Sequence, residues 1–324
     1  MKHSMSVHRS FGRSLVLVAA LAAVVSACSS GSPSGAAASP SGDPAKDKLA
    51  QVQARGTLVL FTDPAYAPQS MKVDGATSAA NTKCGPNQLT APEMDGYDVE
   101  TGKLVAAKLG VEPCFVVVPF DEVIAGNWGD RFDVAWGSGA MTTSRMEKLY
   151  VTQPYYTTPA NFFVKKDSTY KTPADLDGKQ IGACSGCTHE QYLRQTLSLP
   201  GETLTYAVKN PKIVTYATEP PGLDAVVAGT IDAFLCSQPV GAQAIAKGGN
   251  LRMLDTPAFY TYKTGYIDRG MTLAPEAFLA AIDGAIRDLE ASGQLKAASI
   301  KFFGTDYVTA AAAFDMAGVH QTVP

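Results

Sequence analysis

The sequence predicts an α/β protein built as two lobes, and three observations lead to that prediction. Strand and helix signals alternate along the body of the chain, as they do in parallel α/β architecture. The apolar run Phe132–Trp136 ends in Gly137, Ser138 and a hydroxyl-rich turn, typical of a strand that delivers a binding loop to the sheet edge. Without residues 1–27, 297 of the 324 residues remain, a length that favours two lobes or two domains over one core.

Residues 1–27 have the composition of a secretory signal. Three basic residues and no acidic one precede or flank an apolar run, Leu15–Val25, of about 11 residues, too short for a stable transmembrane helix. The run closes on Ser26, Ala27 and Cys28, which resembles a lipobox, so Cys28 is expected to become a lipid-modified N-terminus. An ordinary signal peptide cleaved nearby is the alternative.

Residues 28–51 are predicted to form a lipid-anchored, flexible tether. Ser, Gly, Ala and Pro dominate residues 29–45 and leave nothing to bury. A folded body attached through such a segment stands off the membrane.

The body that follows gives strand and helix signals in order. Its first part predicts a strand at Thr57–Thr62, a helix at Asp98–Leu109, a strand at Phe115–Val118, a helix at Asp121–Asn127 and a strand at Phe132–Trp136. A second set begins near Asn161, with strands at Gln180–Ala183 and Ala233–Cys236 and helices at Thr188–Leu197, Gly222–Ala228 and Val240–Lys247.

Two helices are predicted at the end of the body. Pro275–Ser292 places apolar residues on one face behind an N-terminal proline, which is typical of an amphipathic helix. These residues are Phe278, Leu279, Ile282, Ile286 and Leu289. Gln294–Phe303 predicts one more helix.

Asp133 is followed by Arg145 twelve residues later and then by Gln153–Tyr156. This motif resembles that of family 3 of the bacterial extracellular solute-binding proteins, the amino-acid-type receptors of ABC importers. Similar segments extend over roughly residues 52–304; they are Gly56–Pro68, Met94–Val99, Thr172–Lys179, Ser185–Thr188 and Gly293–Gly304.

The resemblance implies the two-lobed periplasmic-binding-protein fold of type II, in which the chain crosses the hinge twice. The crossings are expected near Tyr156–Phe162 and Phe259–Tyr266. Lobe 1 would comprise 52–157 and 263–312, lobe 2 would comprise 158–262, and 313–324 would be a C-terminal tail.

The same resemblance implies a ligand cleft closed by hinge motion. Tyr66 and Phe120 would be its aromatic walls, and Asp63 would lie deep in the pocket. Arg145 would hold a carboxylate, because its guanidinium donates two parallel charge-assisted hydrogen bonds, with help from Thr188 at a helix start in the other lobe.

Each of these residues also has a simpler role open to it. Tyr66 and Phe120 can be packing residues, Asp63 can cap the turn at Pro64, and Arg145 can pair with a surface carboxylate such as Glu147.

Two positions depart from the family pattern. Ala140 and Ser237 stand where amino-acid receptors hold the α-ammonium with a hydroxyl and an Asp. An ammonium buried without that carboxylate loses a charge-assisted bond. We therefore expect a ligand that keeps a carboxylate but lacks a free α-amino group, or a modified amino acid. Ser138 can supply a replacement hydroxyl.

The cysteines predict disulfides, because five remain besides Cys28 in an oxidising compartment. Cys84 in a long loop and Cys114 before the next strand form a plausible pair. Cys184 and Cys187 form a CxxC between strand and helix, for which a small disulfide ring, redox chemistry and a Cys184–Cys236 bond remain open.

The predicted function is an extracytoplasmic receptor of an ABC importer, lipid-anchored to the outer face of the cell membrane. Its expected partners are a small carboxylate-bearing ligand and an ABC permease, and it is expected to be a monomer without cofactor or metal. A net charge of −3, or −6 without the leader, and the lack of a basic stripe make nucleic acid an unexpected partner. The alternative is an enzyme on the same fold, a cyclic-carboxylate dehydratase, although no catalytic residue is identified.

Overall fold

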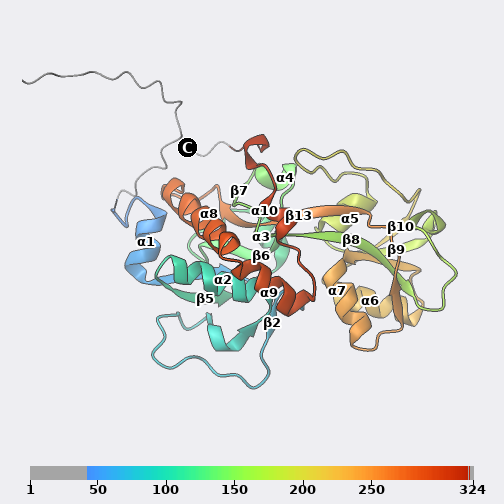
Figure 1. Ribbon diagram of the computed structural model, residues 1–324, viewed down its shortest axis with the longest axis horizontal. Helices are drawn as coiled ribbons and strands as arrows, with labels where there is room; N and C mark the ends of the chain where they lie inside the picture. Colours follow the sequence, from blue (N-terminus) through green and yellow to red (C-terminus); the bar gives the residue numbers. More distant parts are fainter. Residues whose placement is uncertain (1–41, 320, 322–324) are drawn as a thin grey trace, which may run out of the picture. The chain divides into compact units, whose positions relative to one another are not determined.

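The computed structural model describes residues 42–319 and 321, and these form an α/β fold around one mixed sheet (Figure 1). The strands are β1 (Thr57–Phe61), β2 (Met71–Lys72), β3 (Leu89–Thr90), β4 (Met94–Asp95), β5 (Glu112–Val116), β6 (Val134–Ala140), β7 (Leu149–Val151), β8 (Tyr156–Lys165), β9 (Gln180–Cys184), β10 (Lys212–Tyr216), β11 (Ala233–Ser237), β12 (Leu251–Met253) and β13 (Phe259–Asp268). The helices are α1 (Lys48–Arg55), α2 (Tyr97–Lys108), α3 (Phe120–Ala125), α4 (Thr143–Met146), α5 (Thr188–Leu193), α6 (Glu219–Ala228), α7 (Gln238–Ala246), α8 (Glu276–Ala291), α9 (Gln294–Phe303) and α10 (Thr309–Ala312). Short 3₁₀ turns lie at Ala91–Glu93, Pro173–Leu176 and Met316–Gly318.

Two long strands join the halves of the sheet. Strands β8 and β13, ten residues each, pair antiparallel with Tyr156 opposite Lys263 and Ala160 opposite Phe259. The sheet order is β10-β9-β11-β8-β13-β6-β1-β5-β3, so β8 and β13 lie at its middle (Figure 1). On one side β1 pairs parallel with β5 and β6, and on the other β9 pairs parallel with β10 and β11. The chain therefore crosses twice between two α/β lobes.

The buried side chains divide in the same way. Clusters around Trp136 and Phe61 draw on residues up to Tyr156 and from Tyr266 onward. Clusters around Phe162 and Phe234 draw on residues between Ala160 and Phe259. The apolar face predicted for α8 is buried in the first lobe, where α8 packs beside α2 and α9 (Figure 1).

The tether ends earlier than predicted. Helix α1 begins at Lys48, where the sequence predicts flexible chain as far as residue 51. The Asp47 carboxylate accepts a hydrogen bond from Ala50 N at 2.8 Å, and Lys48 Nζ lies 2.7 Å from Asp133 with both side chains buried. Burial of Leu49 in the core adds to this capped, ion-paired start. The leader, Cys28 and the tether as far as residue 41 lie outside the described residues.

The C-terminal segment packs against the first lobe. The centre of the Phe314 ring lies 4.2 Å from the centre of the Tyr262 ring of β13. Phe314, Met316 and Val319 pack against the hydrophobic cluster around Phe61. The Gln321 side chain pairs with both backbone groups of Val151, at 2.7 and 2.8 Å. None of the helices within residues 42–319 has the length and hydropathy that a membrane crossing requires.

Candidate functional site

A cavity of about 60 Å³ lies where the lobes meet. Lobe 1 and the crossing strand β13 contribute Asp63, Ala65, Tyr66, Phe120, Gly137, Ser138, Ala140, Arg145 and Lys263. Lobe 2 contributes Cys184, Ser185, Cys187, Thr188, His189, Ala217, Thr218 and Glu219. The structure thus brings together seven of the eight residues predicted for ligand binding. Ser237 is not among the lining residues, and its buried hydroxyl shares a hydrogen bond with Tyr66 OH at 2.7 Å.

Arg145 is held in a fixed orientation by backbone and side-chain oxygens. It lies on α4, where the N-cap Thr142 hydroxyl accepts a hydrogen bond from Arg145 N. Nη1 donates to Ala140 O at 3.2 Å and to Tyr266 OH at 3.0 Å, and Nη2 donates to Gly186 O at 3.0 Å. Nε is buried and has no hydrogen-bond partner among the described residues. Three of the five guanidinium N–H groups are therefore used by protein oxygens, and the N–H of Nε and the second N–H of Nη2 are not.

Arg145 also stacks on an aromatic ring and forms a hydrogen bond to the other lobe. Its guanidinium carbon lies 5.2 Å from the centre of the Phe120 ring, a cation–π contact that uses the predicted aromatic wall. The bond to Gly186 O and the bond between Tyr66 and Ser237 both join lobe 1 to lobe 2. The lobes are thus joined by two direct hydrogen bonds that involve cavity-lining residues.

Ser138 belongs to a buried network beside the cavity. Its backbone is left-handed, with φ of 57°, and its hydroxyl donates to the Asp98 carboxylate. Tyr155 OH donates to the other Asp98 oxygen at 2.9 Å, and Tyr156 OH lies 2.5 Å from Ser138 Oγ. Burial raises the Asp98 pKa to about 7. The Ser138 hydroxyl is therefore engaged by protein groups.

Two ionisable residues of the cavity, Glu219 and Lys263, were not predicted from the sequence. Glu219 is the first residue of α6, which the sequence analysis began only at Gly222. Prolines at 220 and 221 signal a helix start and would have located it. Lys263 lies on the crossing strand β13, which carries no motif at this position.

Burial controls the ionisation of these groups. It raises the Glu219 pKa to about 8 and lowers the Lys263 pKa to about 8. It also holds the His189 pKa well below its ordinary value, helped by the positive charges of Lys263 and Arg145. His189 Nδ1 lies 3.5 Å from Glu219 Oε1, so a neutral imidazole rests against this carboxyl group. The cavity therefore combines a fixed cation, Arg145, with two groups that titrate near neutrality.

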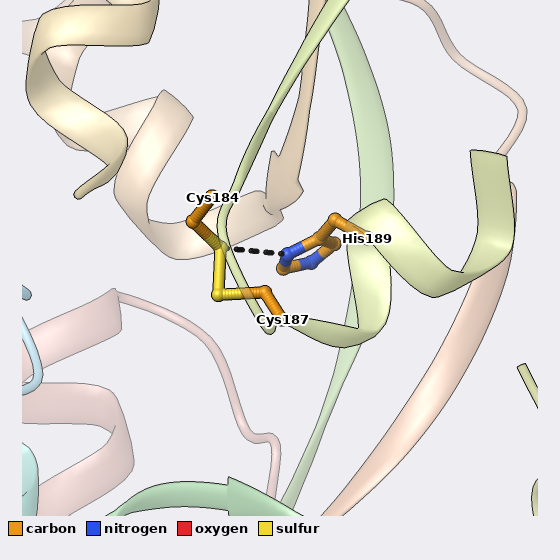
Figure 2. Close-up of side chains that lie close together, drawn as sticks. All are labelled: Cys184, Cys187 and His189. Atoms are coloured by element: carbon orange, nitrogen blue, oxygen red, sulfur yellow. Dashed lines mark hydrogen bonds between the residues drawn. A yellow bond between two sulfur atoms is a disulfide. The ribbon is translucent and has the colours of Figure 1, made fainter. Parts of the chain in front are cut away.

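A disulfide forms part of the cavity wall. Cys184 and Cys187 are bonded, and Cys184 Sγ lies 3.7 Å from His189 Nδ1 (Figure 2). The predicted small ring is thus confirmed, and the alternative bond to Cys236 is wrong because Cys236 is a free, buried thiol. The predicted Cys84–Cys114 disulfide is also confirmed. The cluster of Cys184, Cys187 and His189 has metal-binding residue types, but the disulfide occupies both sulfurs.

Comparison with known proteins agrees with this architecture. The family model for bacterial extracellular solute-binding proteins, family 3, matches residues 58–305. The chain is 26% identical over 260 residues to the L-cystine-binding protein TcyJ of Escherichia coli (strain K12), covering 80% of this chain and 86% of that protein. It is 27% identical over 258 residues to the L-arginine-binding protein of Pseudomonas aeruginosa, covering 78% of this chain and 94% of that protein.

Solved structures match over most of the fold. The amino acid ABC transporter substrate-binding protein AbpA from Streptococcus pneumoniae, bound to L-arginine, superposes with a TM-score of 0.63 at 23% identity, covering 79% of this chain and 98% of that one. An ancestral amino-acid-binding protein, a precursor of cyclohexadienyl dehydratase, superposes with a TM-score of 0.64 at 24% identity, covering 79% and 100%.

Proposed function

The chain belongs to family 3 of the bacterial extracellular solute-binding proteins, and from that membership and its cavity we propose that it captures a small carboxylate-bearing ligand between its lobes and delivers it to an ABC permease. The ligand class is an amino acid, an amino-acid derivative or another organic acid. Relatives that bind L-cystine and L-arginine support the amino-acid part of this proposal.

The single observation that carries the proposal is the state of Arg145. Arg145 is 4% exposed and lines the cavity, its guanidinium is oriented by three oxygens, and its buried Nε has no hydrogen-bond partner among the described residues. A carboxylate is the group that accepts such a donor with charge assistance. Thr188, buried at the first turn of α5, faces the same cavity from lobe 2. Contacts to both lobes would stabilise the closed form.

The cellular location that we propose rests on the N-terminal residues. We propose that residues 1–27 are a signal peptide and that Cys28 carries the lipid that anchors a monomeric receptor outside the cell membrane. With the revised start at Asp47, lobe 1 comprises 47–157 and 263–312, and lobe 2 comprises 158–262. Residues 313–324 then follow lobe 1 as its C-terminal segment.

A receptor is proposed here, not an enzyme. One observation favours dehydratase chemistry as a second candidate: Glu219 is a cavity carboxyl with a pKa of about 8, which suits a general acid. An ancestral relative in the dehydratase lineage has the same fold. A receptor holds its ligand unchanged, whereas a dehydratase would convert a cyclic carboxylate, so turnover separates the two.

The experiment is a thermal-shift screen of the purified chain. The compounds are the twenty standard L-amino acids, L-cystine and their α-deaminated counterparts, followed by chromatography of each mixture. At a ligand concentration of 100 times the Kd, binding raises the free energy of unfolding by about 2.7 kcal/mol and therefore raises Tm. The proposal expects at least one carboxylate to raise Tm and to be recovered unchanged. It fails if no compound raises Tm, and recovery of a new product in place of an added compound would favour the enzyme.

A further inference from the structure

Glu219 is a buried carboxyl group with one unpartnered oxygen. Its side chain is 2% exposed and lines the cavity at the start of α6. Oε1 lies 3.5 Å from His189 Nδ1 and 3.7 Å from Cys184 Sγ. Oε2 is buried and has no hydrogen-bond partner among the described residues, although the Ser237 backbone N–H lies near the carboxyl group and lowers its pKa. Buried polar atoms are nearly always hydrogen-bonded, so this oxygen marks a position for a donor.

Among the described residues, no cationic side chain forms a direct ion pair with this carboxyl group at pH 7. His189 is neutral at pH 7, because burial holds its pKa well below the ordinary value. Lys263 attracts Glu219 from β13, but it forms no ion pair within 4.0 Å in the part of the chain that the structure describes. Arg145 already donates to three protein oxygens.

A second acceptor lies next to it. Thr218 is the N-cap of α6, lines the same cavity and makes no side-chain capping bond. A carboxylate oxygen and a hydroxyl together suit an ammonium, which has three donors. Ser237, by contrast, is taken by its bond to Tyr66.

We propose that Glu219 is the anionic subsite of the cavity and accepts a primary ammonium of a zwitterionic ligand whose carboxylate lies on Arg145. This inference rests on the proposed function and narrows its ligand class to amino acids with a free amine. It replaces the amine-free ligand that Ser237 and Ala140 led us to expect, because the cavity contains the Glu219 carboxyl group in addition to the Asp63 carboxylate expected from the sequence. The acid lies on α6 and not at the end of β11.

Binding at this subsite is coupled to a proton. With its pKa near 8, the ligand-free carboxyl group holds a proton at pH 7 and loses it when the ammonium arrives. The titratable or charged groups around it are His189 on α5, Lys263 on β13, Cys236 on β11, and Asp63 and Tyr66 after β1, while Cys184 is fixed in its disulfide. Affinity for a zwitterion therefore rises between pH 6 and pH 8.

The test is calorimetric titration of the full chain and two variants. The probes are the twenty standard L-amino acids and L-cystine, each binder paired with its α-deaminated counterpart. E219Q removes the charge, and D224N makes the same change at an exposed position five residues along α6. We expect a free amino acid to bind the wild type about 10- to 100-fold more tightly than its deaminated counterpart. E219Q should lose that factor and its discrimination, and D224N should keep both.

A second readout does not depend on a variant. Titration of the wild type at pH 7 in two buffers of different ionisation enthalpy should show release of about one proton per bound amino acid. Equal affinity for amino and deaminated probes, no proton release, or wild-type affinity in E219Q would overturn the inference and leave the proposed function standing. Failure of every probe to bind would count against both.

Discussion

Replacing Glu219 with glutamine is expected to stabilise the ligand-free protein, and more so at pH 7 than at pH 5. The folded pKa is about 8 and the ordinary value is 4.5. Between these values the folded state keeps a proton that the unfolded state has lost, so wild-type stability falls as pH rises through that window. Glutamine does not titrate and removes this fall.

The magnitude follows from the pKa shift. Each pH unit within the window changes the free energy of unfolding by about 1.4 kcal/mol. From pH 5 to pH 7 the wild type therefore loses about 3 kcal/mol that E219Q keeps. The side chain is 2% exposed, so solvent screening reduces this value little. The buried Glu219 carboxylate would thus destabilise the ligand-free protein and would form an ion pair only with the ligand ammonium in the complex.

The assay is urea unfolding of wild type, E219Q and D224N at both pH values. A constant offset in E219Q reflects its changed contact with His189 and does not bear on the argument. The quantity that matters is the growth of the gap between wild type and E219Q by about 3 kcal/mol from pH 5 to pH 7. D224N should show the same pH dependence as the wild type. A gap that is equal at the two pH values would refute the raised pKa of Glu219.

Three further changes test the closed cleft and its supports. Y66F removes the hydroxyl that bonds Ser237 at 2.7 Å between the lobes. The tightest-binding amino-acid probe should therefore bind about 5-fold more weakly in calorimetric titration, and unchanged affinity would contradict this expectation. G186A forces a side chain onto a left-handed residue whose Cβ would lie 2.6 Å from Asp121 Oδ1, and it should weaken binding by at least 10-fold through about 1.4 kcal/mol of strain and displacement. G178A, with nearly the same φ and open space around its Cβ, is the matched control, and equal losses in both variants would sink the contact argument. Replacing Cys84 and Cys114 with serine opens a loop closed over a sequence separation of 30, which should lower the free energy of unfolding by about 4 kcal/mol, whereas a loss near zero would mean that the loop is held by other contacts.

Much of the cavity could be predicted because its residues follow the ends of predicted strands. Tyr66, Gly137, Arg145 and Thr188 each lie just beyond an apolar run, and parallel strands carry such loops to a shared edge. The helix at Gln294–Phe303 has the predicted bounds, whereas the helix predicted at Thr188–Leu197 ends at Leu193 and the strand predicted at Phe115–Val118 lies at Glu112–Val116. The local sequence pattern was sufficient to predict an element wherever its apolar residues followed the period of a single helix or strand.

The remainder depended on contacts distant in sequence. Lys263 reaches the cavity only because β13 pairs with both β6 and β8, and no local pattern reports that pairing. The Ser237 hydroxyl is bonded to Tyr66, which lies 171 positions away in the sequence, and no local pattern predicts that bond. The start of α1 was missed for a similar reason, since Lys48 is fixed by Asp133 on a distant segment. Glu219 differs, because its helix start was signalled locally by two prolines.

The central claim is that one cavity holds a carboxylate on Arg145 and an ammonium on Glu219. A crystal structure of the chain grown with its tightest-binding amino-acid probe tests this most directly. The account predicts ligand carboxylate oxygens within about 3 Å of the Arg145 guanidinium, and the ligand amine within the same distance of Glu219 Oε2. A ligand bound outside the cavity, or one whose carboxylate lies away from Arg145, would contradict it.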